Sequence, residues 1–303
     1  MIRVQGASKA FGPVQAYRDI SLEVARGQMF GIIGPDGAGK TTLIRSLVSL
    51  LHPDAGTIEV LGHSTSTQAR AIRSQVGYMP QRFSLYQDLS VQQNLHFFAG
   101  LFGIPRSQRE ERLRELYRFS RLETFRHRRA GALSGGMKQK LALSCNLIHR
   151  PSLLILDEPT FGVDPVSREE FWQLLAQIRT EGATIVCSTP YMDEAERFDR
   201  LVFLHQGRLV ASGSPDEVRA TYPYPLYRVT GGKLRQLHGW MARQDGVVAV
   251  QLFGGELHVA FASQPNDWQR WQQAAPGGIE SWEPVRPSVE DVFLWRMGGE
   301  HGA

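Results

Sequence analysis

Short apolar segments alternate with segments of helical periodicity through the first two thirds of the chain. The runs at 20–24 and 29–33 have the length of buried strands, and apolar residues then recur at helical spacing from Leu43 to Leu51. Strand-like runs return at 153–156, 183–188 and 201–204, with a helical pattern at 166–180 between the first two. Strands that alternate with helices predict an α/β domain.

The stretch from about residue 82 to residue 150 interrupts this alternation. It lacks convincing strands and carries helical spacing, as in Val91, Leu95 and Phe98. We expect a helical insert there, with the sheet completed after it. His205-Gln206-Gly207 then joins two strand-like runs as a hairpin, so we expect the first domain to span residues 1–221.

A second domain is expected over residues 222–303. Tyr222-Pro223-Tyr224-Pro225 has the composition of a linker, because each X-Pro pair disfavours helix. Five of the six tryptophans lie in the last 64 residues, which is enough aromatic surface for a small separate core. The pattern predicts strands at 226–230, 247–253, 256–262 and 278–284, with helices at 232–243 and 265–274. This β-α-β-β-α-β order indicates a small α+β module of ferredoxin-like type.

Composition excludes several classes of protein. The 303 residues suffice for about two domains. The net charge of +4 is too small for a nucleic-acid-coating tail. The longest apolar candidate, 97–104, is far too short to cross a membrane, and the N-terminus lacks the apolar region of a signal peptide. The two cysteines, Cys145 and Cys187, lie in buried patterns, so we expect free thiols and a reducing cytoplasm.

The clearest chemical motif directly follows the predicted strand 29–33. It matches G-x-x-x-x-G-K-[ST] and precedes a helical pattern, as a phosphate-binding loop requires. Glycines in such a loop let backbone N–H groups point at phosphate oxygens, while Lys40 reaches the β and γ phosphates and Thr41 can ligate Mg²⁺. The predicted nucleotide-binding residues are Gly34, Pro35, Asp36, Gly37, Ala38, Gly39, Lys40, Thr41 and Thr42.

A second motif is the acidic pair Asp157-Glu158 at the end of the run 153–156. A buried strand that ends here delivers both carboxylates to the edge of the sheet where α/β proteins bind ligands. Asp157 is the candidate metal ligand, and Glu158 the candidate base that polarises the attacking water. Read alone, the pair could equally be a charge pair at a helix N-terminus, but the phosphate loop favours catalysis.

The third motif, Leu133-Ser134-Gly135-Gly136-Met137, precedes a helical pattern and forms a second anion site. One chain cannot easily bring it to the phosphates that Gly34 to Thr42 already hold. In this order the motifs resemble the nucleotide-binding subunit of an ABC transporter over residues 2–220. The resemblance implies a P-loop NTPase with a RecA-like sheet and a helical subdomain, whose cofactors are ATP and Mg²⁺. Ser134, Gly135 and Gly136 would then contact the ATP held by a second such subunit.

Further site residues follow from the resemblance alone. Phe11 matches the aromatic residue that stacks on adenine, Gln81 matches the glutamine that senses Mg²⁺ and water, and Asp164 matches the aspartate of the D-loop. Without the family, Phe11 is an ordinary core residue and Gln81 an ordinary loop amide. The resemblance therefore adds Gln81 to Lys40 and Glu158 as a catalytic residue, and to Thr41 and Asp157 as a metal ligand.

The chain departs from the family pattern at Pro190, where the family usually has a histidine. Proline has no side-chain donor and no backbone N–H, so it cannot make the γ-phosphate contact of that histidine. The site is therefore expected to be slow on its own, or to pair with an intact subunit as one of two unequal sites. Met137 and Asp36 also differ from the common residues, and we give them little weight.

The residues of these motifs and of the C-terminal segment Pro287 to Phe293 resemble the sequences of the type-2 exporter branch. Members of this branch work with a separate membrane permease. We expect an ATPase subunit on the inner face of the cell membrane, with a permease and a second nucleotide-binding subunit as partners and no nucleic acid. A regulatory subunit that scarcely hydrolyses ATP stays open, as does a soluble ABC ATPase acting on ribosomes or DNA. The nine arginines at 106–129 indicate a solvated helix face, contact with the permease or anionic lipid headgroups or, as a third option, contact with nucleic acid.

Overall fold

The computed structural model describes residues 1–82, 85–265 and 268–298. It divides into two compact units, Met1–Ser212 and a second unit that begins at Gly213. The sequence placed the division at 221/222. The structure places it earlier because helix α7 (Pro215–Arg219) packs with the C-terminal helix α10 (Val289–Gly298) of the second unit.

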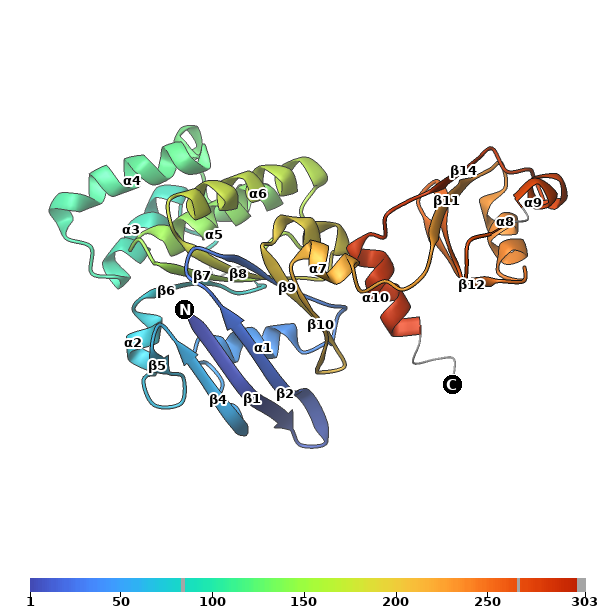
Figure 1. Ribbon diagram of the computed structural model, residues 1–303. Helices are drawn as coiled ribbons and strands as arrows, with labels where there is room; N and C mark the ends of the chain where they lie inside the picture. The colour runs from blue at the N-terminus through green and yellow to red at the C-terminus, as the bar shows by residue number, and fades with distance from the viewer. Residues whose placement is uncertain (83–84, 266–267, 299–303) are drawn as a thin grey trace. The chain divides into compact units, whose positions relative to one another are not determined.

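The first unit is built on a six-stranded sheet with the order β10-β9-β3-β8-β7-β6 (Figure 1). The five strands from β9 to β6 run parallel. Strands β3, β7 and β8 are buried along their whole length, as their apolar sequences require. The strands are β3 (Met29–Ile33), β6 (Val76–Met79), β7 (Leu153–Asp157), β8 (Thr184–Thr189), β9 (Arg200–His205) and β10 (Arg208–Gly213). The predicted α/β class is therefore confirmed.

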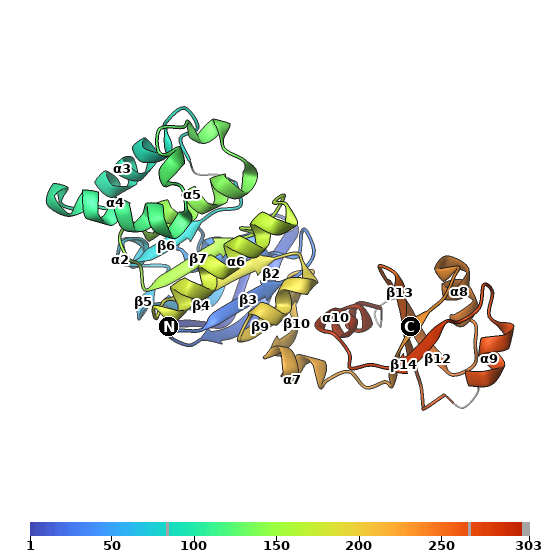
Figure 2. The same cartoon turned by 90° about the horizontal axis from the view of Figure 1, so that it is seen from above.

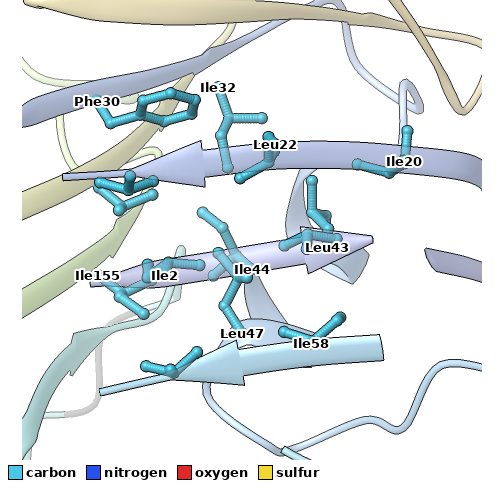
Figure 3. Packing of buried hydrophobic residues seen from close by; sticks show 14 of the residues in the cluster. Ile2, Ile20, Leu22, Phe30, Ile32, Leu43, Ile44, Leu47, Ile58 and Ile155 are labelled. Atoms are coloured by element: carbon cyan, nitrogen blue, oxygen red, sulfur yellow. The ribbon is translucent and has the colours of Figure 1, made fainter. Parts of the chain in front are cut away.

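A second, antiparallel sheet in the same unit was not predicted. Its order is β2-β1-β4-β5, and its strands are β1 (Ile2–Phe11), β2 (Val14–Val24), β4 (Ala55–Val60) and β5 (His63–Ser64). Helix α1 (Lys40–Leu47) contributes Leu43, Ile44 and Leu47 to the core that joins the two sheets, as Figure 3 shows. The helix ends at Leu47 rather than at the predicted Leu51, because Ser49 adopts a left-handed conformation with φ 58°.

Helices dominate the stretch between β6 and β7, as predicted, and gather to one side of the parallel sheet in Figure 2. Helix α3 begins at a capping box in which Ser90 and Gln93 bond each other's backbone N–H groups. The helices of this insert are α3 (Val91–Leu101), α4 (Arg106–Ser120), η1 (Glu123–Phe125), η2 (Ala130–Ala132) and α5 (Gly135–Leu147). Outside it lie α2 (Ala69–Arg73), α6 (Pro165–Thr180) and η3 (Met192–Arg197).

The second unit has a four-stranded sheet of order β12-β13-β11-β14 in which every neighbouring pair is antiparallel. This is the strand order of the ferredoxin-like motif. Its elements are β11 (Leu226–Thr230), α8 (Leu234–Met241), β12 (Val247–Phe253), β13 (Glu256–Phe261), α9 (Trp268–Ala274) and β14 (Ser281–Pro284). Part of the helix predicted at 265–274 falls on residues 266–267, which lie outside the described residues.

Helix α10, which follows this motif, was not predicted as a helix. The Ser288 hydroxyl accepts a hydrogen bond from the Asp291 N–H at 3.1 Å, and Val289, Val292 and Phe293 are buried. Within the described ranges, none of the helices has the length and apolar character needed to cross a membrane. Cys145 and Cys187 are both buried free thiols.

Candidate nucleotide site

The loop between β3 and α1 has the backbone that a phosphate cradle requires. A Cβ on Gly34 would lie 2.1 Å from the Leu204 carbonyl oxygen, and one on Gly39, where φ is 103°, would lie 2.1 Å from the Ala16 carbonyl oxygen. Only glycine fits at either position. Among the described hydrogen bonds, the N–H groups of Gly37 and Gly39 have no acceptor within the loop. These donors are therefore free to bind an anion at the start of α1.

Lys40, the first residue of α1, reaches back across this loop. Its Nζ donates to the carbonyl oxygens of Gly34 at 2.7 Å and Pro35 at 3.0 Å. It also forms an ion pair of 2.9 Å with Glu158 Oε1, and both side chains are 3% exposed. The buried ammonium is thus already neutralised by the carboxylate that sequence analysis assigned to catalysis.

Glu158 has a second partner in Gln81, which lies just beyond β6. Gln81 Nε2 donates to Glu158 Oε2 at 2.8 Å, and the backbone N–H of Glu158 donates to Ser188 Oγ at 3.0 Å. The structure therefore brings together Gln81 from the segment after β6, Lys40 from the start of α1 and Glu158 from the residue after β7. It also adds Ser188, at the end of β8, which sequence analysis did not identify.

Asp157, the last residue of β7, lies beside Thr41 and Ser188. Its Oδ1 accepts from Thr41 Oγ1 at 3.1 Å and from Ser188 Oγ at 2.8 Å. Burial raises the pKa of this carboxyl above its usual range, although the two hydrogen bonds oppose the rise.

The other oxygen, Asp157 Oδ2, is buried and has no hydrogen-bond partner among the described residues. A buried, unpartnered carboxylate oxygen is costly unless something binds it. Carboxylate and hydroxyl oxygens are the protein ligands that Mg²⁺ takes beside substrate phosphates. Asp157 and Thr41 therefore fit a magnesium site beside the phosphate loop.

The remaining predicted residues lie apart from this cluster. Phe11 ends β1, and its side chain is 48% exposed, so it is no core residue. Lys9 Nζ lies 5.5 Å from the centre of the Phe11 ring. An exposed aromatic face at a strand end can stack on a planar ring, as the resemblance expects.

Ser134, Gly135 and Gly136 form the N-terminus of α5, where the Ser134 hydroxyl accepts from the Met137 N–H at 3.3 Å. A Cβ on Gly136 would lie 2.4 Å from Ser167 of α6. No hydrogen bond of the described residues joins this segment to the phosphate loop of the same chain. Asp164 begins α6 by accepting from the Ser167 N–H at 2.9 Å, and this bond lowers the pKa of its carboxyl.

Thr189 and Pro190 complete the end of β8. The Thr189 carbonyl oxygen accepts from the Gly34 N–H at 3.3 Å, which ties β8 to the start of the phosphate loop. Thr189 Oγ1 accepts from the Tyr191 N–H at 3.0 Å. Pro190 therefore stands at the edge of the site but brings no donor to it.

The sheet, the loop after β3 and the acidic pair define a P-loop nucleotide-binding protein. The ABC transporter family model matches residues 17–161. A model described as the C-terminal domain of DrrA1-3-like ATP-binding proteins matches residues 213–297.

Individual relatives agree with these models. Nod factor export ATP-binding protein I of Rhizobium sp. (strain N33) is 37% identical over 99% of this chain and 97% of its own length. "Probable multidrug ABC transporter ATP-binding protein YbhF" of Escherichia coli is 40% identical over 73% of this chain, which spans 38% of that protein. A solved dimeric ATP-binding cassette with ADP and Pi has a TM-score of 0.64 and 25% identity, covering 71% of this chain and 98% of its own. The chain therefore belongs to the ABC transporter ATP-binding proteins, in the DrrA-like and Nod-factor-export-like branch.

Proposed function

We propose that this chain binds Mg²⁺ and ATP and hydrolyses the nucleotide as the motor subunit of an exporter. The observation that carries the proposal is the hydrogen-bonded cluster of Lys40, Thr41, Gln81, Asp157 and Glu158, which come from three segments that meet at one sheet edge. The relatives named as multidrug and Nod factor export proteins support the exporter branch.

Each residue of the cluster has a role in this reaction. The phosphate oxygens accept hydrogen bonds from the free N–H groups of the loop, and Lys40 pairs with phosphate oxygens in place of Glu158. Glu158 is then free to orient the attacking water and to accept its proton, with Gln81 holding the opposite carboxylate oxygen. Thr41 and Asp157 would hold Mg²⁺, which neutralises phosphate charge when bound.

A second nucleotide-binding subunit would complete the site. Ser134 to Gly136 offer a helix N-terminus to an anion, yet they lie against Ser167 of their own chain rather than against their own phosphate loop. A partner's ATP would satisfy this helix end. The similarity to a cassette solved as a dimer supports this arrangement.

The membrane partner would be a permease at the inner face of the cell membrane, where this chain would be a peripheral subunit. Closure of the two nucleotide-binding subunits on ATP, and their opening after hydrolysis, would drive the permease. A regulatory subunit with slow hydrolysis is the second candidate, because Pro190 brings no donor to the γ-phosphate.

The experiment is the steady-state ATPase rate of the purified chain over a range of protein concentrations, beside Glu158→Gln and Pro190→His. We expect the rate per chain to rise with concentration and to vanish in Glu158→Gln. Pro190→His is expected to raise the rate. A wild type that binds ATP but stays silent until a second subunit or a permease is added would favour the regulatory subunit.

A further inference from the structure

A buried carboxylate outside the cluster, Glu194, joins three elements of the first unit. It lies in η3, the short helix after β8, and is 2% exposed. Its Oε1 accepts from Thr160 Oγ1 and from Trp172 Nε1, each at 2.9 Å. Its Oε2 accepts from Thr189 Oγ1 at 2.5 Å.

All three donors are neutral groups, and the described ion pairs include none with Glu194. A buried carboxylate that lacks a cation depends on its hydrogen-bond donors for compensation. Glu194 therefore holds Thr160, Trp172 and Thr189 tightly against one another.

Two of these donors adjoin the nucleotide site. Thr160 is the second residue after Glu158, in a turn where the Phe161 N–H donates to the Glu158 carbonyl oxygen at 3.2 Å. Thr189 follows Ser188, whose hydroxyl bonds both Asp157 and the Glu158 N–H. One carboxylate thus holds the turn after β7 against the last residue of β8.

We propose that Glu194 is a positioning residue for ATP hydrolysis, which fixes the direction of Glu158 by holding Thr160 and Thr189 together. This inference rests on the proposed role of Glu158 as the base. Glu158 itself has a left-handed backbone with φ 49°, so its carboxylate direction depends on how the following turn is held. Thr189 is the last residue of β8, and Pro190 after it has no donor to offer, so the hydrogen bond from Thr189 is what holds this end of β8 to Glu194.

The test separates the two hydroxyls by near-isosteric substitution. Thr160→Val and Thr189→Val each remove one donor to Glu194 and keep the shape of the side chain, while Thr160→Ser and Thr189→Ser keep the donor. Ile178→Val, a change at a buried residue of α6 that removes no hydrogen bond to Glu194, is the matched control for lost stability. For each variant, kcat and KM for ATP are measured together with the thermal midpoint.

We expect each valine variant to lower kcat about ten- to a hundred-fold and to leave KM for ATP almost unchanged. The serine variants keep kcat close to that of the wild type. The double valine variant has a kcat only a little lower than that of either single valine variant, because both substitutions act through Glu194. Ile178→Val lowers the midpoint and keeps kcat. The inference is overturned if the valine variants keep the wild-type kcat, or if their losses of kcat add in the double variant. It is also overturned if kcat falls only in proportion to the thermal midpoint, so that the loss reflects stability alone.

The Glu158→Gln variant, assayed in parallel, distinguishes a failure of the proposal for Glu194 from a failure of the proposed function. Activity that survives Glu158→Gln overturns both the role of Glu158 and the role of Glu194. Activity that is lost in Glu158→Gln but unchanged in the valine variants overturns the role of Glu194 alone.

Discussion

Without nucleotide, Glu158 is bound to the lysine that we expect to hold phosphate, and this predicts an unusual stability effect. Glu158→Gln removes the carboxylate charge and keeps the side-chain shape. Lys40 Nζ then loses its ion pair of 2.9 Å in a site where both side chains are 3% exposed. The carbonyl oxygens of Gly34 and Pro35 remain as its acceptors.

Removal of one partner from a buried ion pair costs about 3–5 kcal/mol. Because two carbonyl acceptors remain for Lys40, we expect a smaller loss, about 2 kcal/mol of unfolding free energy. This corresponds to a fall of about 4–8 °C in the thermal midpoint of a unit of this size. ATP brings new negative charge to Lys40, so a saturating concentration should narrow the gap between variant and wild type.

The assay is thermal unfolding of both proteins with and without ATP. Glu23→Gln is the matched control, because Glu23 pairs with Arg3 at 2.9 Å and both side chains are more than half exposed. An exposed pair is worth less than about 1 kcal/mol, and ATP should not change its effect. Equal midpoints for Glu158→Gln and wild type, or a gap that ATP leaves unchanged, would refute the reasoning.

Three further predictions concern other residues. Burial raises the pKa of Asp157 above the pKa that this carboxyl has in the unfolded chain. Asp157 therefore lowers the stability of the fold as pH rises from the unfolded pKa through the folded pKa, because the buried carboxyl then ionises. Asp157→Asn should raise the thermal midpoint without nucleotide at pH 7 and abolish Mg²⁺-stimulated ATPase activity. Phe11→Ala should raise KM for ATP about five- to tenfold, from roughly 1 kcal/mol of lost stacking, with kcat kept; an unchanged KM speaks against adenine stacking. Burial alone would lower the pKa of His258, but its hydrogen bond of 2.9 Å to Asp291 and the nearby charges raise it. The stabilisation of the second unit by protonated His258 is full below the pKa of about 6.5 in the unfolded chain, and it is lost as pH rises through the pKa of the folded chain. Thermal midpoints followed by tryptophan fluorescence should therefore depend on pH, and Asp291→Asn should diminish this dependence.

The phosphate loop and the acidic pair could be predicted because each is contiguous and follows an apolar strand. Parallel strands bring their carboxyl ends to one edge, so Lys40, Asp157 and Glu158 meet there. Ser188 was within reach of the same argument, since it lies near the end of the predicted strand 183–188. Glu194 was not, because its burial depends on donors from three separate segments.

The antiparallel sheet was missed for a physical reason. In β1 the register with β2 shifts between Val4 and Ala7, where Gly6 has φ 57°, so side chains do not alternate regularly along the strand. In β4 only Ile58 and Val60 are buried. In the second unit, β11 and β12 match their predicted bounds because Gly and Pro residues mark their ends.

The central claim is that the site is shared, with the phosphate loop of one chain facing Ser134 to Gly136 of another. The most direct test mixes two inactive variants, Lys40→Ala and Ser134→Arg. Each alone should hydrolyse no ATP, while a mixed dimer contains one site built from an intact loop and an intact Ser134. Activity that returns on mixing is the predicted result. A mixture that stays silent although both variants fold and Ser134→Arg still binds ATP, or a Ser134→Arg protein that is fully active alone, would contradict the account.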